Sequence, residues 1–224
     1  MVDEREAAVS LEGVCYAYPK NEVFSLEVPE LRFAAGECAA LVGPNGGGKT
    51  TLGKLIAGLI KPSRGSVLLG GEDIAGWPLG KIGARIGYLF QEPSRQIFAP
   101  TVLEDVTFPL TLKGMGEDQA RELARSILAR FDMGSLEEAV TYTLSRGEKQ
   151  RLAIAAMLVN KPGFIVLDEP TNGLDARRKR ILGDMLEQLA QEGVGALLIS
   201  HDAAFVHERA GAVYRMDEGR VTTL

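Results

Sequence analysis

The sequence predicts an α/β protein whose sheet core begins with antiparallel strands and is interrupted by a block of helices. Two observations lead to this prediction. Apolar runs at residues 38–42, 164–167 and 196–199 are short and continuous, as in strands buried on both faces of a sheet. Helical periodicity dominates residues 92–160, between the first and second of these runs. We therefore expect one domain over residues 1–224 with a helical insertion near its middle.

Five strands are expected before the insertion, in addition to the helix described next. Alternating apolar and polar residues predict antiparallel strands at 8–16 and 23–33, ahead of the apolar run at 38–42. Another strand is expected at 66–69 and a further one at 86–90, with a stretch rich in glycine and turn residues between them.

A helix is expected over residues 50–60, directly after the buried strand at 38–42. One face of this helix would carry four apolar side chains, Leu52, Leu55, Ile56 and Leu59. The segment Lys61-Pro62-Ser63 is expected to end it, because proline cannot continue a helix.

Within the insertion, helices are expected at 117–131, where apolar residues form one stripe, and at 147–159. The alternation of strand and helix resumes after Pro162. The elements expected there are strands at 164–167, 196–199, 212–216 and 220–223 and a helix at 177–191.

Composition argues against several classes of protein. Hydrophobic residues make up 46% and charged residues 25%, and no apolar run approaches the ~18 residues that a membrane span needs. The segment 1–6 is acidic and polar, unlike a secretory signal. A net charge of −5 gives no general reason to expect nucleic-acid binding. We interpret the basic run at 177–180 as the solvated face of a helix, and the two cysteines, Cys15 and Cys38, as packed residues rather than zinc ligands.

Residues 43–50 fit the phosphate-loop pattern G-x-x-x-x-G-K-[ST], with a buried strand before them and a helix after them. The glycines would let backbone N–H groups surround the β-phosphate. Lys49 would reach the β- and γ-phosphates, and the Thr50 hydroxyl would bind Mg²⁺. The residues expected to bind phosphate are Gly43, Pro44, Asn45, Gly46, Gly47, Gly48, Lys49, Thr50 and Thr51.

A pair of acidic residues, Asp168 and Glu169, ends the apolar strand at 164–167. Ligands of open α/β sheets bind at this edge. Asp168 is expected to hold Mg²⁺ and Glu169 to polarise the attacking water. Alone, two acids at a strand end would be weak evidence, and the phosphate loop gives them weight.

Three further side chains would emerge near the loop. Gln91 follows the strand at 86–90 and could contact Mg²⁺ or the attacking water, while His201 follows the strand at 196–199 and could donate to the γ-phosphate. By spacing alone, a structural role is the more frequent one for each. Tyr18 could stack on an adenine ring or belong to the core, and Tyr16 is the alternative for stacking.

Residues 144–151 read Leu-Ser-Arg-Gly-Glu-Lys-Gln-Arg. Ser145 and Gly147 would lie at the N-terminus of a helix, where exposed N–H groups and the helix dipole favour an anion. The chain would then have two phosphate-binding surfaces far apart in sequence. That arrangement suggests one nucleotide held between two subunits.

These segments together resemble the ATP-binding-cassette (ABC) ATPase family, in the family's order and over essentially the whole chain. The resemblance implies a P-loop NTPase core at 1–91 and 161–224, a helical sub-domain carrying the signature segment at 92–160, and hydrolysis of ATP to ADP and phosphate with Mg²⁺. It strengthens the roles given to Tyr18 and Gln91.

The resemblance also implies roles for individual residues. Glu169 would be the catalytic base and His201 the switch histidine. Ser145 and Gly147 would contact the γ-phosphate of ATP bound to a partner cassette, and Asp175 would belong to the loop that meets the partner's phosphate loop. The signature here is Ser-Arg-Gly-Glu, where the commonest form is Ser-Gly-Gly-Gln. Arg146 therefore adds positive charge near the expected γ-phosphate, and Glu148 replaces an amide, yet we expect activity to survive.

The segment 91–106 looks like the energy-coupling-factor type, the ATPase subunits of cobalt, nickel and vitamin importers, with Gln-Ile-Phe-Ala-Pro-Thr-Val at 96–102 as its most specific part. This likeness implies a second cassette, in a homodimer or a heterodimer, at the cytoplasmic face of the membrane. It also implies a transmembrane coupling protein and a separate substrate-binding membrane protein. The transported substrate would bind that other polypeptide.

The sequence argues against two other functions. ABC ATPases of nucleic-acid repair or translation usually carry a long coiled-coil insertion, a second cassette or zinc-binding cysteines, which this sequence lacks, so no nucleic-acid partner is expected. A small-molecule kinase on a phosphate-loop core would not explain residues 144–148 or 172–175.

Overall fold

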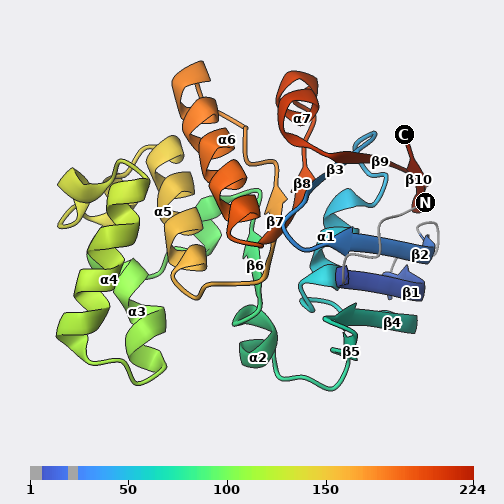
Figure 1. The fold of residues 1–224 in the computed structure, drawn as a ribbon, viewed down its shortest axis with the longest axis horizontal. Coiled ribbons are helices and arrows are strands. Elements are labelled where there is room, and N and C mark those ends of the chain that lie inside the picture. Colours follow the sequence, from blue (N-terminus) through green and yellow to red (C-terminus); the bar gives the residue numbers. More distant parts are fainter. Residues whose placement is uncertain (1–6, 20–24) are drawn as a thin grey trace.

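The computed structural model describes residues 7–19 and 25–224, and within them ten strands form one mixed sheet covered by helices (Figure 1). The strand order is β5-β4-β1-β2-β10-β9-β3-β8-β7-β6. The strands are β1 (Ala7–Ala17), β2 (Ser25–Ala34), β3 (Cys38–Val42), β4 (Arg64–Leu69), β5 (Glu72–Asp73), β6 (Ile86–Leu89), β7 (Phe164–Asp168), β8 (Gly195–Ile199), β9 (Ala212–Asp217) and β10 (Arg220–Thr223). The helices are α1 (Lys49–Ile56), α2 (Leu79–Gly83), α3 (Val102–Leu112), α4 (Glu117–Arg130), α5 (Arg146–Leu158), α6 (Ala176–Gln191) and α7 (Ala203–Arg209).

The sheet has an antiparallel part, as predicted, and a parallel part. β1 pairs antiparallel with β2 and β4, and β4 pairs antiparallel with β5. β3 pairs parallel with β8 and β9, and β7 pairs parallel with β6 and β8. The strand expected at 23–33 begins at Ser25, and its first two positions lie outside the described residues.

Both faces of the parallel part are buried, which explains its continuous apolar runs. In β7, Phe164 and Val166 pack into the same hydrophobic cluster as Leu52 of α1. Ile165 and Leu167 point to the opposite face and join the cluster formed with α3 to α6. A strand covered by helices on both sides has no solvated face, so polar residues do not alternate along it.

The prediction for the first helix is wrong at its C-terminal end, because α1 stops at Ile56 rather than continuing to residue 60. Gly58 has a φ of 65°, and its N–H donates to the Leu55 carbonyl over 3.0 Å. The Leu59 N–H donates to the Lys54 carbonyl over 2.9 Å, which completes a left-handed glycine cap. Leu59, expected on the buried helical face, is therefore 41% exposed.

The helices α3, α4 and α5 lie between β6 and β7 in the chain and gather at one end of the molecule, with α5 beside α6 (Figure 1). Helices α4 and α5 occur within one residue of the positions expected at 117–131 and 147–159. The boundaries of the core and the helical sub-domain, at 91/92 and 160/161, stay a prediction. In the part of the chain that the structure describes, none of the helices is both long enough and apolar enough to cross a bilayer.

Candidate functional site

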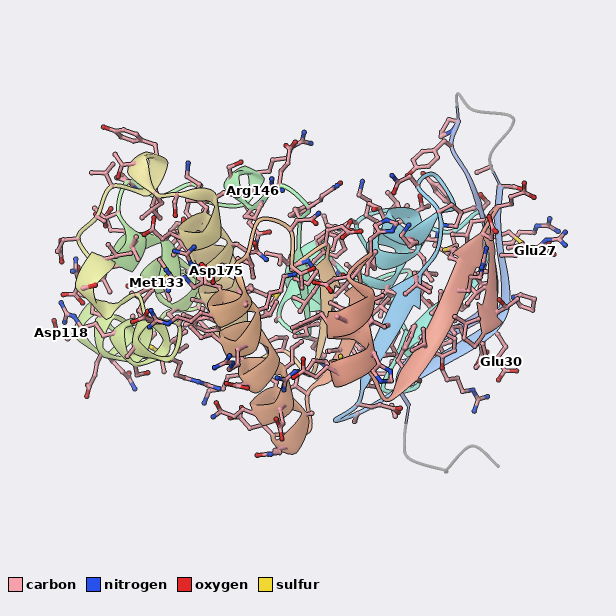
Figure 2. All side chains as sticks on the ribbon, turned by 90° about the horizontal axis from the view of Figure 1, so that it is seen from above. Glu27, Glu30, Asp118, Met133, Arg146 and Asp175 are labelled. Atoms are coloured by element: carbon pink, nitrogen blue, oxygen red, sulfur yellow. The ribbon has the colours of Figure 1, made fainter. Side chains whose placement is uncertain are left out.

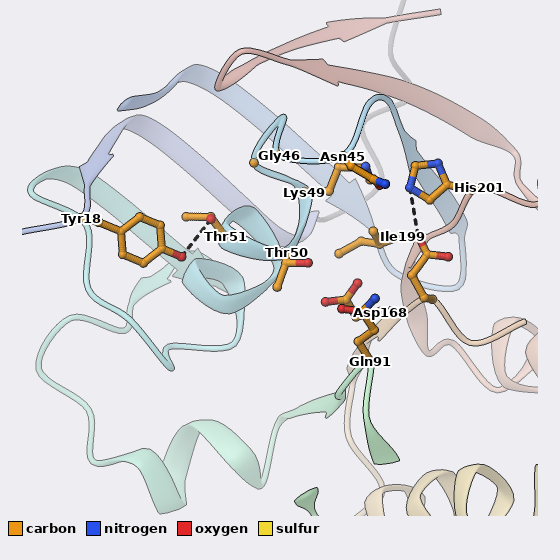
Figure 3. A pocket seen from close by; sticks show the side chains of 12 residues that line it. Tyr18, Asn45, Gly46, Lys49, Thr50, Thr51, Gln91, Asp168, Ile199 and His201 are labelled. Carbon is orange, nitrogen blue, oxygen red and sulfur yellow. Dashed lines mark hydrogen bonds and ion pairs between the residues drawn. The ribbon is translucent and has the colours of Figure 1, made fainter. Parts of the chain in front are cut away.

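A cavity of about 570 Å³ opens where the parallel strands β3, β6, β7 and β8 end (Figure 3). Strands that run in the same direction deliver their C-terminal residues to one edge of the sheet, so segments far apart in sequence meet there. The residues that line the cavity are Tyr18, Asn45, Gly46, Gly48, Lys49, Thr50, Thr51, Gln91, Asp168, Glu169, Ile199 and His201. All but Ile199 belong to the set predicted from sequence.

The phosphate loop follows β3 and depends on its glycines. Gly46 and Gly48 have φ angles of 79° and 110°, which side-chain-bearing residues rarely adopt. Gly43 has a φ of 140°, and a Cβ added there would lie 2.0 Å from the Met216 carbonyl oxygen in β9. The loop therefore packs against β9 at a distance that only glycine allows. Gly43, Pro44 and Gly47 shape this loop without lining the cavity themselves.

Lys49, the first residue of α1, is buried, and its ammonium group bridges the loop. Its Nζ donates to the carbonyl oxygens of Gly43 and Pro44, each over 2.8 Å. Burial lowers the pKa of Lys49, and the negative charges of Glu169 and Asp168 oppose that shift. The arrangement holds a cationic donor at the mouth of a loop whose N–H groups can bind phosphate.

Asp168, the last residue of β7, is only 2% exposed. Its Oδ2 accepts a hydrogen bond from the Tyr88 hydroxyl over 3.1 Å. Burial raises the pKa of Asp168, while hydrogen bonds from Thr50 and Tyr88 and the charges of Lys54 and Lys49 act in the opposite direction. Sequence reasoning missed Tyr88, although it lies in β6, the strand that pairs directly with β7.

The carboxylate of Asp168 and the hydroxyl of Thr50 are hard oxygen ligands on adjacent elements, a set that suits Mg²⁺. Residues 7–19 and 25–224 contain no group of three or more His, Cys, Asp or Glu side chains that could hold a metal by themselves. The pair Asp168 and Thr50 fits Mg²⁺, which usually binds through one or two protein ligands together with the phosphates of its substrate.

Glu169 has an unusual backbone, with a φ of 54° in the left-handed region that residues other than glycine seldom occupy. Its N–H donates to the Ile199 carbonyl over 2.8 Å, and its Oε1 lies 3.3 Å from Nε2 of His201 (Figure 3). Burial raises the pKa of Glu169, and the charge of His201 is the largest effect in the opposite direction. Strained backbone positions cluster at functional sites, so this geometry marks Glu169 as more than a strand-end acid.

A network of hydrogen bonds holds the segment next to Glu169 and His201. Thr171 Oγ1 and Ser200 Oγ are 3.3 Å apart, and Ser200 Oγ accepts the N–H of Asp202 over 3.1 Å. Asp202 in turn pairs with Lys179 of α6 over 2.6 Å. The segment that carries His201 is thus held from the β7 side and from α6. Sequence reasoning had placed Lys179 only in a solvated basic run.

The two candidate aromatic residues occupy different positions. Tyr18 lines the cavity, and its hydroxyl lies 3.1 Å from Thr51 Oγ1. The Tyr16 ring packs edge-on behind it, with centroids 5.0 Å apart and an angle of 86° between the planes. Of the two residues, only Tyr18 lines the cavity.

The signature residues Ser145, Arg146, Gly147 and Glu148 do not line the cavity. Ser145 is the N-cap of α5, where the Glu148 N–H donates to Ser145 Oγ over 3.4 Å and the Ser145 N–H donates to Glu148 Oε2 over 2.7 Å. These reciprocal bonds form a capping box. The hydrogen bonds from Ser145 hold the pKa of Glu148 below its usual value. Glu148, which replaces the glutamine of the commonest signature, therefore has a local structural role.

Arg146 and Asp175 lie at the N-terminal ends of α5 and α6 (Figure 2). A Cβ added at Gly173 would be 3.5 Å from Arg146 Cδ, so the two segments are neighbours. Asp175 caps α6 by accepting the Arg178 N–H over 2.8 Å, and it also pairs with the Arg178 guanidinium over 3.0 Å. Asp175 does not line the cavity either.

This fold and this cavity define an α/β P-loop ATPase of the cassette class. A family model described as ABC transporter matches residues 26–172, and the chain belongs to that family.

Three known proteins illustrate the similarity. The energy-coupling factor transporter ATP-binding protein EcfA of Methanothermobacter thermautotrophicus is 37% identical over 216 residues, which cover 95% of this chain and 69% of that protein. CbiO1 from Clostridium perfringens, part of the ABC transporter complex CbiONQ, is 32% identical with a TM-score of 0.85, covering 97% of this chain and 88% of that chain. MJ0796, a bacterial ABC transporter cassette with a dimeric structure, is 27% identical with a TM-score of 0.86, covering 96% of this chain and 98% of that chain. Other curated relatives are longer, and the chain spans 39% and 34% of two of them.

Proposed function

We propose that this chain is the ATP-hydrolysing subunit of a membrane importer of the energy-coupling-factor type, which takes up a metal ion or a vitamin. It would act as a peripheral subunit at the cytoplasmic face of the membrane. The observation that carries the proposal is the convergence of Lys49, Asp168, Glu169 and His201 on one cavity. Similarity to EcfA and CbiO1 supports the importer type.

In this proposal the phosphate loop and Lys49 bind the β- and γ-phosphates, and Tyr18 stacks on the base. Thr50, Asp168 and Gln91 hold Mg²⁺, which neutralises phosphate charge when it is bound. Asp168 and Thr50 line the same cavity, and the carboxylate of Asp168 is buried there. Catalysis then depends mostly on positioning and charge stabilisation.

Glu169 is the proposed general base. A water attacks the γ-phosphorus, the bond from that phosphorus to the bridging oxygen of ADP breaks, and Glu169 takes the proton that the water loses. Burial raises the pKa of Glu169 toward the operating pH, which suits a proton acceptor. His201, 3.3 Å away, donates to the γ-phosphate oxygen and holds the carboxylate in place.

Two cassettes complete the site. Ser145 and Gly147 of one subunit cap the ATP held by the other, and Asp175 meets the partner's phosphate loop. The support is geometric, because none of these residues lines its own chain's cavity although they begin two neighbouring helices. The dimeric structure of the similar cassette MJ0796 supports the pairing of two cassettes. The second cassette is a copy of this chain or a related subunit.

The Glu169→Gln variant tests this proposal. With ATP and Mg²⁺ it should form a stable dimer in size-exclusion chromatography, and its hydrolysis should fall by about 10²- to 10⁴-fold, the usual contribution of general acid–base catalysis. Glu122→Gln, an exposed change on α4, is the matched control and should behave as wild type. Only monomer at high protein and ATP concentrations would overturn the two-cassette model.

A second surface suits the transmembrane coupling protein. A groove of about 290 Å³ between α2, β6, α3 and α5 includes the exposed apolar side chains of Leu79 and Phe98 and the ring of Pro109. Two buried acceptors there, Asp105 Oδ2 and Asn160 Oδ1, have no hydrogen-bond partner within the described part of the chain. The groove therefore suits a partner segment that combines apolar side chains with hydrogen-bond donors.

Gln96 connects this groove to the nucleotide cavity. It lines the groove, its Oε1 accepts the Phe90 N–H over 3.0 Å, and its Nε2 donates to the Ala153 carbonyl of α5 over 3.4 Å. Movement of the segment that carries Gln91 would thus reach both the groove and the signature helix. Phe98→Asp should abolish co-purification with the coupling protein and spare nucleotide-driven dimerisation. The same acid placed at exposed Arg32 is the control, and unchanged co-purification of the Phe98 variant would contradict the assignment.

A further inference from the structure

An exposed aromatic residue stands beside the signature segment and has no role in the proposal above. Tyr142 is 79% exposed and lies three residues before Ser145. Tyrosine combines a large contact area with few rotatable bonds, and it is enriched where a surface binds something else. An exposed ring so close to a segment that should face a nucleotide therefore points to a ligand contact.

The backbone that carries Tyr142 is firmly held. It forms a 3₁₀ turn, Thr141–Thr143. The buried Thr141 hydroxyl donates to the Ala99 carbonyl over 2.7 Å, and Lys149 Nζ of α5 donates to the Tyr142 carbonyl over 3.1 Å. The ring thus projects from a fixed turn, so little backbone entropy would be lost if it bound a ligand.

In the proposed nucleotide cavity, a base would be covered by an aromatic ring on one face only. Among the described residues that line it, Tyr18 is the only phenylalanine, tyrosine or tryptophan. Its hydroxyl bonds to Thr51 and its ring rests against Tyr16, so one face of a base can stack on it. The opposite face of that base would be open to solvent in a single chain.

We propose that Tyr142 of one copy stacks on the outer face of the adenine whose inner face rests on Tyr18 of the other copy. This inference rests on the two-cassette function proposed above. If Ser145 meets the γ-phosphate of the partner's ATP, Tyr142 lies within about 10 Å of it, since three residues of chain span at most that length. This separation is comparable to the distance from the γ-phosphate of ATP to its adenine. The base is then held between two aromatic rings, one from each subunit.

The arrangement distinguishes two binding events. ATP bound to a single chain touches Tyr18 and not Tyr142, whereas ATP in the dimer touches both. Loss of Tyr142 should therefore weaken nucleotide-driven dimerisation and leave ATP binding to the monomer unchanged. Purines offer a larger stacking surface than pyrimidines, so the effect should be larger with ATP than with CTP.

The experiment uses Glu169→Gln protein, with dimerisation followed by analytical ultracentrifugation during titration with Mg²⁺ and ATP. Adding Tyr142→Ala should raise the ATP concentration needed for half-dimerisation by about 5- to 150-fold, the range expected for loss of one base–aromatic stack. Tyr142→Phe should stay within about twofold of the parent, because it keeps the ring. Leu112→Ala, an exposed apolar change on α3, is the matched control, and thermal melts should show all variants folded.

Three outcomes would overturn the inference. Unchanged dimerisation of Tyr142→Ala would show that the ring contacts nothing in the complex. An equal loss with ATP and CTP would show that it contacts protein rather than the base. Failure of the Glu169→Gln parent itself to dimerise would remove the proposed function, and this inference with it, so the two failures are distinguishable.

Discussion

Replacing Tyr88 by phenylalanine removes one hydroxyl from beside a buried carboxylate. The Tyr88 hydroxyl donates to Asp168 Oδ2 over 3.1 Å, and Asp168 is 2% exposed, so water cannot readily replace the lost donor. A hydrogen bond to a charged group contributes about 1.5–3 kcal/mol to stability. For a chain of this length each kcal/mol shifts Tm by about 2–4 °C, so we expect a decrease of about 3–12 °C at pH 8.

The loss should depend on pH in a defined direction. The Tyr88 hydroxyl opposes the rise that burial causes in the pKa of Asp168, so removing it raises that pKa further. Wild type and variant then differ most when Asp168 is ionised in both, above both folded-state pKa values. The stability difference shrinks as the pH falls through those values, because a protonated carboxyl gains little from the donor.

Urea unfolding at pH 8, 6.5 and 5 measures this dependence. Tyr214→Phe is the matched control, because the Tyr214 hydroxyl donates to the backbone carbonyl of Arg32, an uncharged acceptor, over 3.4 Å. The loss of stability from this substitution should be small and independent of pH. The Tyr88 variant should also need more Mg²⁺ for half-maximal hydrolysis. A loss below about 0.5 kcal/mol at pH 8, the lower limit for a net hydrogen bond, or a loss equal at all three pH values, would refute the reasoning.

Other substitutions test further features. Gly43→Ala should weaken Mg²⁺–ATP binding at least tenfold in calorimetry and destabilise the fold by about 1–3 kcal/mol, since its Cβ would lie 2.0 Å from the Met216 carbonyl; unaltered binding would contradict the loop geometry. Glu148→Ala should lower the unfolding free energy by about 0.5–2 kcal/mol through loss of the cap on Ser145. Glu148→Gln should preserve most of the cap. Equal losses of unfolding free energy from the two substitutions would argue against a capping role for Glu148. Burial raises the pKa of Asp105, so its ionisation costs stability as the pH rises through the folded pKa. In urea unfolding, the free energy of unfolding of Asp105→Asn should therefore increase relative to that of wild type between pH 4 and 8. A stability difference that does not vary with pH would show that ionisation of Asp105 is not responsible.

The sequence predicted the parts of the site that are contiguous. The phosphate loop, the pair Asp168 and Glu169, and the position of Gln91 follow from strand-to-loop patterns that span only a few residues. Helix ends were harder to predict: proline at 62 suggested where α1 stops, but Gly58 ends it earlier by adopting a positive φ. A glycine permits that conformation without requiring it, so the pattern alone did not decide the matter.

By itself, then, the sequence determined the α/β class, the order of the segments and the chemical type of each site residue. These properties depend on backbone preference and apolar periodicity, which are set by residues close together in the chain. Tertiary structure alone decided those contacts between distant side chains that no motif had predicted. Tyr88 reaches Asp168 across 80 positions of chain, and Lys179 holds Asp202 beside His201. It also left Tyr142 exposed while fixing its backbone. Such contacts depend on how strands align and helices pack, and those arrangements are set by burial across the whole sheet rather than by any single segment.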